Sequence, residues 1–576
     1  MSTRTATSSR WAPPPMPAGR RWRNGNACMP CFSRRPRRCA MRDRPDLSPA
    51  RTERRCSGMV GRCMLAVAAA LLAACTSLAL DVPRVPSHAF DQPLLTSLGR
   101  TYFPQLASAP GQSGFHLLVS GPEAFAARGA LAEAAERSLD LQYYSVADDS
   151  TATLLLDGAI RAAQRGVRVR LLVDDLNVGD RESRLAILAA HPNMEVRLFN
   201  PFSQRGSFGL AQVLELLGDG ERLNRRMHNK LWIADGAVAV MGGRNLGNAY
   251  FNVSQERDFA DLDVLAAGPV VADVSRSFDR YWNSRGAVPI AAIAGPAPSP
   301  AELRQARAGI AAQAADFRES GYVRSLRKTA FGALVRTGQV PLVVAPAEAL
   351  SDVPVDPFAG SLETTSAIFP VLRKAVEKAR HEVILVSPYL VPGATGVQVL
   401  CALARRGVRV RILTNSLAST DVPVVHAGYA RYRPQMLACG VALYELRPGG
   451  PGARSPRLGL SSGASLHAKA VVVDGEAVFI GSMNLDPRSS KINTEVALRI
   501  ESQELGRQLT VLFGEATTLD QVFEVELDEP GNAASSLHWQ SLEDDRPVRY
   551  SSDPLASAWR VWMARFLGEL APEALL

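Results

Sequence analysis

Two stretches of eighteen residues decide how this sequence is organised: HNKLWIADGAVAVMGGRN at 228–245 and HAKAVVVDGEAVFIGSMN at 467–484. Each opens on His-x-Lys and carries an Asp-Gly pair between two apolar runs, which predicts a β-hairpin closed by a favoured two-residue turn. Residues i and i+2 of a strand project from one face, so the His and the Lys of each stretch are expected side by side. Asp235 and Asp474, at the two turns, are expected to be structural.

The side chains at the ends of each stretch suit an anion better than a metal ion. Lys supplies positive charge, Asn supplies amide donors, and His, with an ordinary pKa of about 6.5, can be a nucleophile or an acid and base near neutral pH. A single His-x-Lys would be read as a surface strand. Because the pattern occurs twice with the same spacing, we expect one catalytic site made from His228, Lys230, Asn245, His467, Lys469 and Asn484.

The sequence around the two stretches is duplicated as well. RGVRVRLL at 165–172 matches RGVRVRIL at 406–413, and helix and strand patterns alternate in both regions. Such order predicts a parallel or mixed sheet covered by helices, hence an α/β fold. The expected strands are 139–144, 167–173, 383–386 and 408–413, and the expected helices are 130–137, 152–164, 372–379 and 397–404.

The N-terminal region differs from the rest in charge. Residues 1–74 hold 15 Arg and three acidic residues, a net charge of +12, so the remaining chain has a net charge of −3 although the whole chain has +9. A duplex-binding protein normally carries a basic domain, so no nucleic acid is expected as a partner. Segment 1–58, rich in Arg, Pro and Ser and without apolar periodicity, is expected to be disordered or untranslated.

Residues 59–75 have the layout of an export signal. Arg62 precedes an apolar run at 64–74, which is too short to span a bilayer. Leu-Ala-Ala-Cys at 72–75 resembles a bacterial lipobox, which implies lipidation at Cys75. An uncleaved hydrophobic anchor is the alternative.

Cysteines are scarce in the body of the chain. Five of the eight precede Cys75, which leaves only Cys401 and Cys439 beyond it. No disulfide framework is expected from this distribution, and a bond between Cys401 and Cys439 remains open.

The pattern HxKxxxxD followed by GGxN or GSxN resembles the phospholipase D superfamily, and the resemblance covers residues 120–525. TNSLASTD at 414–421 and GYARY at 428–432 look like the bacterial cardiolipin synthases of the C type. The resemblance implies two tandem phospholipase D-like α/β/α sandwich domains that share one active site at their interface.

The resemblance also implies a chemistry. One His attacks phosphorus to form a phosphohistidine, and the other protonates the leaving oxygen and later activates the acceptor; we expect His228 as the nucleophile and His467 as the acid and base. The Lys and Asn side chains would surround the phosphoryl oxygens. Ser482 would add a hydroxyl on one side only, because the first stretch has Gly243 at that position.

Two carboxylates complete the expected site. Asp261 and Glu495 hold the positions at which the family carries a carboxylate that orients each His, although a solvated strand charge is the alternative for both. No clustered ligand spacing indicates a metal, and no cofactor is expected, since two Lys can stabilise phosphoryl charge electrostatically.

The favoured function is phosphatidyl transfer that gives cardiolipin from phosphatidylglycerol and a second phospholipid. Hydrolysis to phosphatidic acid is the alternative, and a nuclease or a non-catalytic lipid-binding lipoprotein is less favoured. The expected partners are phospholipid substrates and a membrane. The expected location is the bacterial cell envelope, with a lipid anchor on the periplasmic side.

Near the C-terminus, apolar residues at helical spacing predict an amphipathic helix packed on the core, with a helix on a membrane surface as the alternative: Trp559, Trp562, Met563, Phe566, Leu567 and Leu570.

The expected division of the chain follows from these features. After the signal we expect a tether at 76–112, a first domain at 113–290, a linker with a helix at 291–350, a second domain at 351–525 and an extension at 526–576.

Overall fold

The computed structural model describes residues 82–178, 181–203, 215, 219–254, 258–295, 298–354, 356, 366–449 and 465–570. The Arg-rich segment 1–58, the signal-like segment 59–75 and Cys75 lie outside the described residues. What we predict for them stays a prediction.

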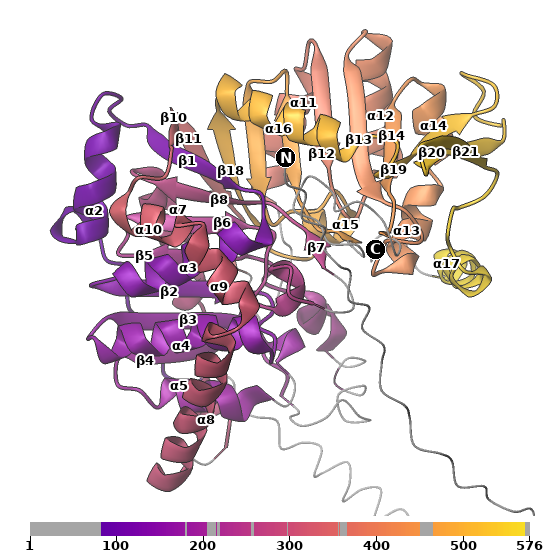
Figure 1. The fold of residues 1–576 in the computed structure, drawn as a ribbon. Coiled ribbons are helices and arrows are strands. Elements are labelled where there is room, and N and C mark those ends of the chain that lie inside the picture. The colour runs from indigo at the N-terminus through magenta and orange to yellow at the C-terminus, as the bar shows by residue number, and fades with distance from the viewer. Residues whose placement is uncertain are drawn as a thin grey trace, which may run out of the picture. The chain divides into compact units, whose positions relative to one another are not determined.

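A nine-stranded mixed sheet forms the framework of the first half (Figure 1). Its strands, in spatial order, are β10 Val343–Ala345, β1 Ser113–Leu118, β8 Asp263–Ala267, β6 Val238–Gly242, β5 Leu231–Ala234, β2 Ser138–Tyr143, β3 Arg168–Asp174, β4 Met194–Phe199 and β9 Ala287–Pro289. Strands β2, β3 and β4 are parallel, and the hairpin β5–β6 lies antiparallel beside β2.

A ten-stranded sheet forms the framework of the second half. In spatial order its strands are β11 Ala347–Ser351, β18 Val496–Glu501, β17 Ala477–Gly481, β16 Ala470–Val473, β12 Glu382–Val386, β13 Arg409–Asn415, β14 Ala442–Leu446, β19 Val522–Leu527, β20 Leu537–Glu543 and β21 Arg546–Tyr550. The order β18-β17-β16-β12-β13-β14 repeats the order β8-β6-β5-β2-β3-β4 of the first half. The predicted duplication and the α/β fold are therefore confirmed.

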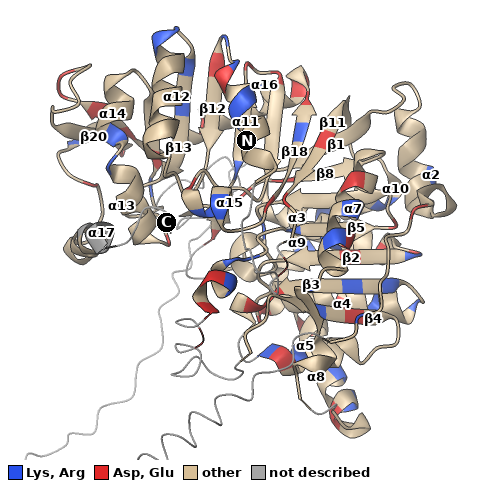
Figure 2. Ribbon diagram, turned by 180° about the vertical axis from the view of Figure 1, so that it is seen from behind, with Lys and Arg blue, Asp and Glu red and all other residues tan. Residues whose placement is uncertain are grey.

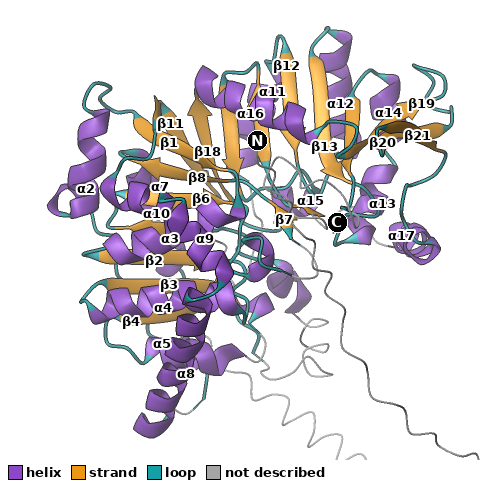
Figure 3. Cartoon of the chain, viewed as in Figure 1, coloured by secondary structure: helices purple, strands orange, loops and turns teal. Residues whose placement is uncertain are grey.

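Helices cover both sheets (Figure 3). The helices of the first half are α2 Ser97–Tyr102, α3 Gly121–Ala134, α4 Ser150–Gln164, α5 Glu182–Ala189, α7 Val270–Trp282, α8 Pro300–Arg318, α9 Gly321–Lys328 and α10 Phe331–Thr337. Those of the second half are α11 Ile368–Glu377, α12 Gly393–Arg405, α13 Pro423–Ala430, α14 Arg433–Ala438, α15 Pro487–Lys491, α16 Gln503–Ala516 and α17 Ala558–Leu570.

The apolar core joins the two halves. One cluster buries side chains from both sheets together with α7 and α16, among them Phe278 and Phe513. A second cluster packs α3 and α4 on the other face of the first sheet, and a third packs α11 and α12 on the second sheet. Each sheet therefore lies between two helical layers, and the helical layers at the centre belong to a shared core.

The two hairpins differ from the prediction in detail. Each turn has three residues between paired ends, Ala234 with Val238 and Val473 with Ala477, instead of two. Asp235 (φ 55°) and Asp474 (φ 53°) adopt the left-handed conformation, which Asp tolerates better than most residues. The regular strands also begin after the Lys, so each His-x-Lys lies in an extended approach to its strand.

Further strands lie at the edges of the duplicated part of each sheet. Ala287–Pro289, at the end of the expected first domain, forms the edge strand β9 beside β4. Val343–Ala345 forms the opposite edge strand β10 beside β1. Leu537–Glu543 and Arg546–Tyr550 extend the second sheet at its far edge. The linker predicted at 291–350 with a helix carries α8, α9 and α10 in its described part.

Helix α17 does not bury its aromatic residues as the packed-helix prediction requires. Trp559, Trp562 and Phe566 are 62%, 52% and 47% exposed and stack on one another along the helix. The helix contacts α13. Arg560 anchors it by donating to the carbonyl oxygen of Leu417 at 3.0 Å. Its aromatic face is therefore a surface feature.

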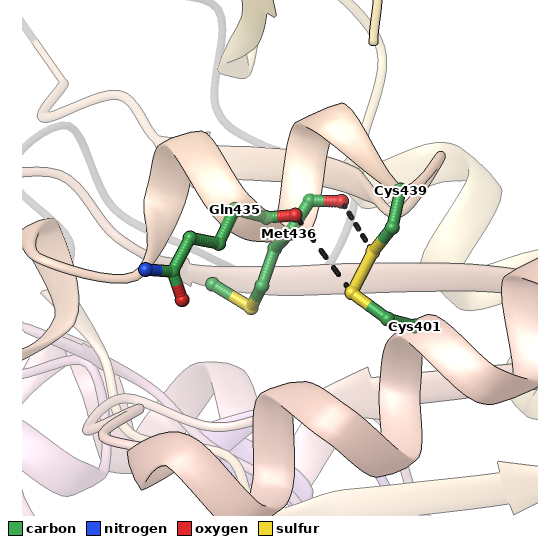
Figure 4. The surroundings of a disulfide bond; sticks show 4 residues. All are labelled: Cys401, Gln435, Met436 and Cys439. Atoms are coloured by element: carbon green, nitrogen blue, oxygen red, sulfur yellow. Dashed lines mark hydrogen bonds between the residues drawn. A yellow bond between two sulfur atoms is a disulfide. The ribbon is translucent and has the colours of Figure 1, made fainter. Parts of the chain in front are cut away.

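The open question about the two body cysteines has an answer in the structure. Cys401 on α12 and Cys439 after α14 form a disulfide, with Cα atoms 5.3 Å apart (Figure 4). The bond ties together two helices on one face of the second sheet. The sequence gives the first half no equivalent, since it has no cysteine between Cys75 and Cys401.

Charges of both signs are interspersed over the helices and strand ends of both halves (Figure 2). Within the described part of the chain, no helix combines the length and the apolarity needed to cross a bilayer.

Candidate active site

The chain immediately before β5 carries His228 into contact with the second half. The backbone N–H of His228 donates to the carbonyl oxygen of Thr494 at 2.9 Å. The imidazole Nδ1 lies 3.0 Å from one oxygen of the Glu495 carboxyl group and 3.1 Å from the other. A histidine of the first half is thus oriented by a carboxyl group of the second.

The chain before β16 makes the reciprocal contact. β15 (Ser465–Leu466) pairs with β7 (Phe259–Ala260) of the first half, and the N–H of His467 donates to the carbonyl oxygen of Ala260 at 2.7 Å. Nδ1 of His467 lies 2.6 Å from the Asp261 carboxylate. Each expected carboxylate therefore orients the histidine of the opposite copy, and the site exists only where both halves meet.

A polar side chain at the end of one sheet strand fixes each approach segment. Asp174, at the end of β3, accepts a hydrogen bond from the N–H of Met227 at 2.9 Å. Asn415, at the equivalent end of β13, accepts from the N–H of Leu466 and donates to its carbonyl oxygen, both at 2.9 Å. These residues hold the chain directly before each His. The strand predicted at 167–173 ends directly before Asp174, for which no role was predicted.

Because each Nδ1 faces a carboxyl group, Nε2 is the nitrogen left to meet a substrate. Among the described residues, no group hydrogen-bonds Nε2 of His228 or of His467. A neutral imidazole that donates from Nδ1 carries its lone pair on Nε2, which is the arrangement a nucleophile or a base needs.

Both lysines are buried beside the histidines. Lys230 donates to the carbonyl oxygen of His228 at 2.5 Å, and its ammonium group lies 5.3 Å from the centre of the Tyr144 ring. Lys469 donates to the carbonyl oxygen of His467 and lies 3.0 Å from its Nδ1. Burial lowers the pKa of Lys230 to about 7 and that of Lys469 to about 8. A bound phosphate would favour the charged forms of both.

The two carboxyl groups differ in their ionisation. Burial raises the pKa of Glu495 to about 7, against the effect of Lys230 and of two hydroxyl groups. Burial would raise the pKa of Asp261 too, but His467 and Lys469 outweigh it and hold that pKa below its ordinary value. Asp261 is therefore the ionised partner near neutral pH, whereas Glu495 lies near its midpoint.

The histidines differ in the same sense. Burial, followed by the charges of Lys230 and Lys469, lowers the pKa of His228 well below its ordinary value. Burial and Lys469 also lower the pKa of His467, but the Asp261 carboxylate opposes that shift. His467 is thus the imidazole with an ionised counter-charge, and His228 is the one held neutral.

The hydroxyl of Ser482 bonds to a carboxyl group within the site. It donates to Glu495 at 2.5 Å, and Ser489 donates to the other oxygen of Glu495 at 2.8 Å. Ser489 also accepts from the N–H of Asn484 at 3.2 Å. Ser489 was not predicted as a site residue, although it lies five residues after Asn484 in a short polar run.

The counterpart of Ser482 has a steric reason to be glycine. A Cβ placed on Gly243 would overlap the carboxylate of Asp261. The first copy therefore has no hydroxyl at 243 because the Asp261 carboxylate lies too close to this backbone for a side chain.

The two asparagines lie at the edge of the cluster. Asn245 accepts from the N–H of Ser145 at 3.1 Å and donates to the Tyr250 hydroxyl at 2.9 Å; the Tyr250 ring packs against His467. The side-chain oxygen of Asn484 is buried without a hydrogen-bond partner among the described residues. Asn484 therefore has unused capacity that a ligand could fill.

The turn aspartates lie apart from the cluster, as expected. Asp235 accepts from the backbone N–H groups of Glu136, Arg137 and Ser138 at 2.7 to 3.2 Å. Asp474 accepts in the same way from the N–H groups of residues 380–382. Each turn carboxylate caps the start of the strand that pairs with its hairpin.

The fold assembles one ligand-type cluster that sequence spacing does not reveal. Within the described residues, His426, Glu445 and Asp553 bring their ligand atoms together. The guanidinium of Arg433 already lies 3.0 Å from Glu445 and 2.9 Å from Asp553. A buried cation between the two carboxylates opposes a metal ion there, so this cluster fits a structural ion-pair network.

The chain is similar to several known proteins. The family described as "Cardiolipin synthase, PLD-like domain" matches residues 130–282 and 372–516, one segment in each half. Cardiolipin synthase C of Escherichia coli (strain K12) is 40% identical over 487 residues, 82% of this chain and 100% of that protein. An uncharacterized protein of Helicobacter pylori is 32% identical over 76% of this chain and 85% of its own length. A solved phosphatidylserine synthase of Haemophilus influenzae Rd KW20 aligns with a TM-score of 0.48 and 15% identity, covering 70% of this chain and 86% of that one.

Proposed function

This chain belongs to the family of cardiolipin synthase PLD-like domains, and from that premise we propose that it transfers a phosphatidyl group to the alcohol of a second phospholipid, giving cardiolipin. The observation that carries the proposal is the reciprocal pairing of His228 with Glu495 and of His467 with Asp261, beside two buried lysines. Two imidazoles with unlike partners suit a reaction in which one attacks phosphorus and the other handles a proton.

The proposed first step forms a phosphohistidine. The lone pair on Nε2 of neutral His228 attacks phosphorus while the bond from phosphorus to the leaving alcohol breaks. That alcohol oxygen takes a proton from Nε2 of His467, whose imidazolium form the Asp261 carboxylate favours. Lys230 and Lys469 stabilise the negative charge on the phosphoryl oxygens.

The proposed second step returns both histidines to their starting states. Neutral His467 accepts the proton of the acceptor hydroxyl as its oxygen attacks phosphorus, and the bond from phosphorus to His228 breaks. With phosphatidylglycerol as acceptor the product is cardiolipin. With water as acceptor the product is phosphatidic acid, which is the alternative activity of the same site.

Purified protein tests this proposal directly. Vesicles of phosphatidylglycerol with a second phospholipid are incubated with the protein, and the products are resolved by mass spectrometry. Cardiolipin is the expected product, and phosphatidic acid as the only product would favour the hydrolase. Activity should survive a strong chelator once vesicle effects of divalent ions are controlled; a complete loss that one specific metal restores would contradict the metal-free mechanism.

For location, we propose a lipid anchor at Cys75 in the bacterial cell envelope, on the periplasmic side, with the chain starting near Met59. The lipobox-like run supports the anchor. The exposed aromatic face of α17 suits contact with a membrane surface. Deleting 1–58 should leave membrane fractionation intact, and Cys75→Ala should release or mis-sort the protein. Unchanged fatty-acid labelling of Cys75→Ala would exclude the anchor.

A further inference from the structure

The second half contains a cavity. Its volume is about 670 Å³, within the range of about 300 to 1,000 Å³ typical of sites for small ligands. It lies between α11, the start of α12 and α15. Its wall is largely aliphatic and includes Leu372, Val376, Leu390, Val391, Val399 and Leu485.

One side of this cavity is lined by residues that directly follow a residue of the catalytic cluster in the chain. Leu485, Asp486 and Pro487 line it and directly follow Asn484. Successive Cα atoms are 3.8 Å apart, so Asn484 lies within about 11 Å of Pro487. Helix α15 then carries Ser489, which donates to Glu495, the carboxyl group that orients His228. A molecule whose phosphate met both histidines would have the cavity within reach of its remaining atoms.

The chemistry of the lining selects an apolar occupant. Two backbone polar groups of the lining pair with each other, since the N–H of Val391 donates to the carbonyl oxygen of Leu485 at 2.8 Å. The Asp486 side chain accepts from the N–H of Ser489 at 2.7 Å and so caps α15. The basic residues of the lining, Arg373 and Lys491, are on exposed positions. Aliphatic walls with basic side chains confined to exposed positions suit a hydrocarbon chain attached to an anionic headgroup.

We propose that this cavity binds an acyl chain of the phospholipid whose phosphate reacts at His228. The inference rests on the proposed function for its substrate class and adds the subsite that holds the lipid tail. The cavity acts by binding alone and has no part in the covalent step. It should therefore affect long-chain lipids and leave the reaction of short-chain lipids unchanged.

Two matched variants on α12 separate this role from general damage. Ala394 is exposed and lines the cavity, so Ala394→Trp fills the cavity without replacing a core residue. Ala402 is also exposed, does not line the cavity, and lies eight residues, about 12 Å, further along the helix. Ala402→Trp is therefore the control with the same change in side chain.

Photolabelling reports occupancy without needing turnover. Phosphatidylglycerol with a diazirine in one acyl chain is irradiated with the full-length protein, and labelled peptides are mapped by mass spectrometry. Labels are expected within 369–376 and 390–400, reduced at least fivefold in Ala394→Trp and unchanged in Ala402→Trp. Labels elsewhere, or an equal reduction in both variants, would overturn the proposal. Labelling by a diazirine fatty acid that excess phosphatidylglycerol fails to compete away would make this a fatty-acid site and would also overturn it.

Kinetics distinguish this inference from the proposed function. Ala394→Trp is expected to raise KM for long-chain phosphatidylglycerol at least fivefold, with turnover of a dihexanoyl analogue unchanged. Equal effects on both chain lengths would contradict an acyl subsite. If neither substrate reacts but the labels map to the cavity, the subsite stands and the transfer reaction fails. If cardiolipin forms but the labels lie elsewhere, the transfer reaction stands and the acyl subsite is wrong.

Discussion

The two copies of the motif place their histidines in the same site, but the side chains around each histidine differ. His467 meets a short Asp261, whose close approach to the backbone requires glycine at 243. His228 meets a longer Glu495, which receives hydrogen bonds from Ser482 and Ser489. The first arrangement lowers the pKa of its carboxylate, and the second leaves its carboxyl group with a pKa of about 7. A duplicated fold thus gives two histidines that are not equivalent.

The largest expected effect comes from removing either histidine. His228→Ala and His467→Ala should each lower turnover by about a thousandfold or more, because the two act as a unit. Only His228→Ala should abolish the covalent adduct. With a substrate bearing a good leaving group, His467→Ala is expected to accumulate phosphorylated His228, detected by mass spectrometry after a quench that preserves acid-labile phosphohistidine.

The same experiment can show that the roles of the two histidines are exchanged. An adduct on His467 in the His228→Ala protein would exchange the roles of the two residues. Full activity in either variant would remove the two-histidine mechanism altogether.

Exchanging the small residues tests the geometric difference. Gly243→Ser places a side chain where the Asp261 carboxylate lies, so it should reduce kcat by about a hundredfold and destabilise the fold by about 1–3 kcal/mol. Ser482→Ala removes one donor to Glu495 but leaves Ser489, so a loss of about tenfold is expected. Steady-state kinetics with urea unfolding of the same samples gives both quantities. A larger loss in Ser482→Ala than in Gly243→Ser would contradict the steric account.

These contrasts mark what the sequence could predict. The alternating helix and strand patterns and the repeated RGVRVRLL and RGVRVRIL stretches predicted the α/β halves, because periodicity and repeats are local signals. The crossing of each carboxyl group to the opposite histidine depends on how two sheets pack, and no local spacing encodes that. The roles of Asn415 and Ser489 depend on the same packing. The packed helix was favoured over the surface helix for Trp559 because amphipathic spacing indicates a face without saying what covers it.

The unequal carboxyl groups also predict a narrow pH optimum for kcat/KM. Activity should rise as Glu495 ionises near pH 7, because the ionised form accepts from Nδ1–H and leaves the Nε2 lone pair of His228 free. It should fall as His467, whose pKa burial and Lys469 lower, loses the proton that the first step needs, and as Lys230 and Lys469 lose theirs near pH 7 to 8. Ser482→Ala should move the acid limb upward, since its hydrogen bond lowers the pKa of Glu495. A rate independent of pH between 6 and 9 would contradict these assignments.

Stability should follow the same carboxyl group. The folded-state pKa of Glu495 lies above its ordinary value of 4.5, so the protonated form is favoured by folding. Its contribution is fully present at low pH and is lost as pH rises from about 4.5 to about 7. Glu495→Gln should flatten this part of the stability curve in urea titrations, and an unchanged slope would show that Glu495 is ionised throughout.

The smallest expected effect on activity concerns a feature that only the second half has. The disulfide between Cys401 and Cys439 joins residues 38 apart in sequence. In the chain-entropy description, closing a loop of this length stabilises the folded state by about 4 kcal/mol, and measured values are commonly about 2–4 kcal/mol. Replacing both cysteines by serine should lower the free energy of unfolding by about that amount while turnover changes less than about twofold, because neither sulfur contacts the catalytic cluster. Urea unfolding of this variant, and of the parent with and without a reductant, measures the difference. Disulfides persist mainly in oxidising compartments, so the bond also bears on the proposed export of the chain. Free thiols at both positions, trapped by alkylation at the moment of cell lysis, would contradict a periplasmic location. The second half would then, like the first, be stabilised without a disulfide.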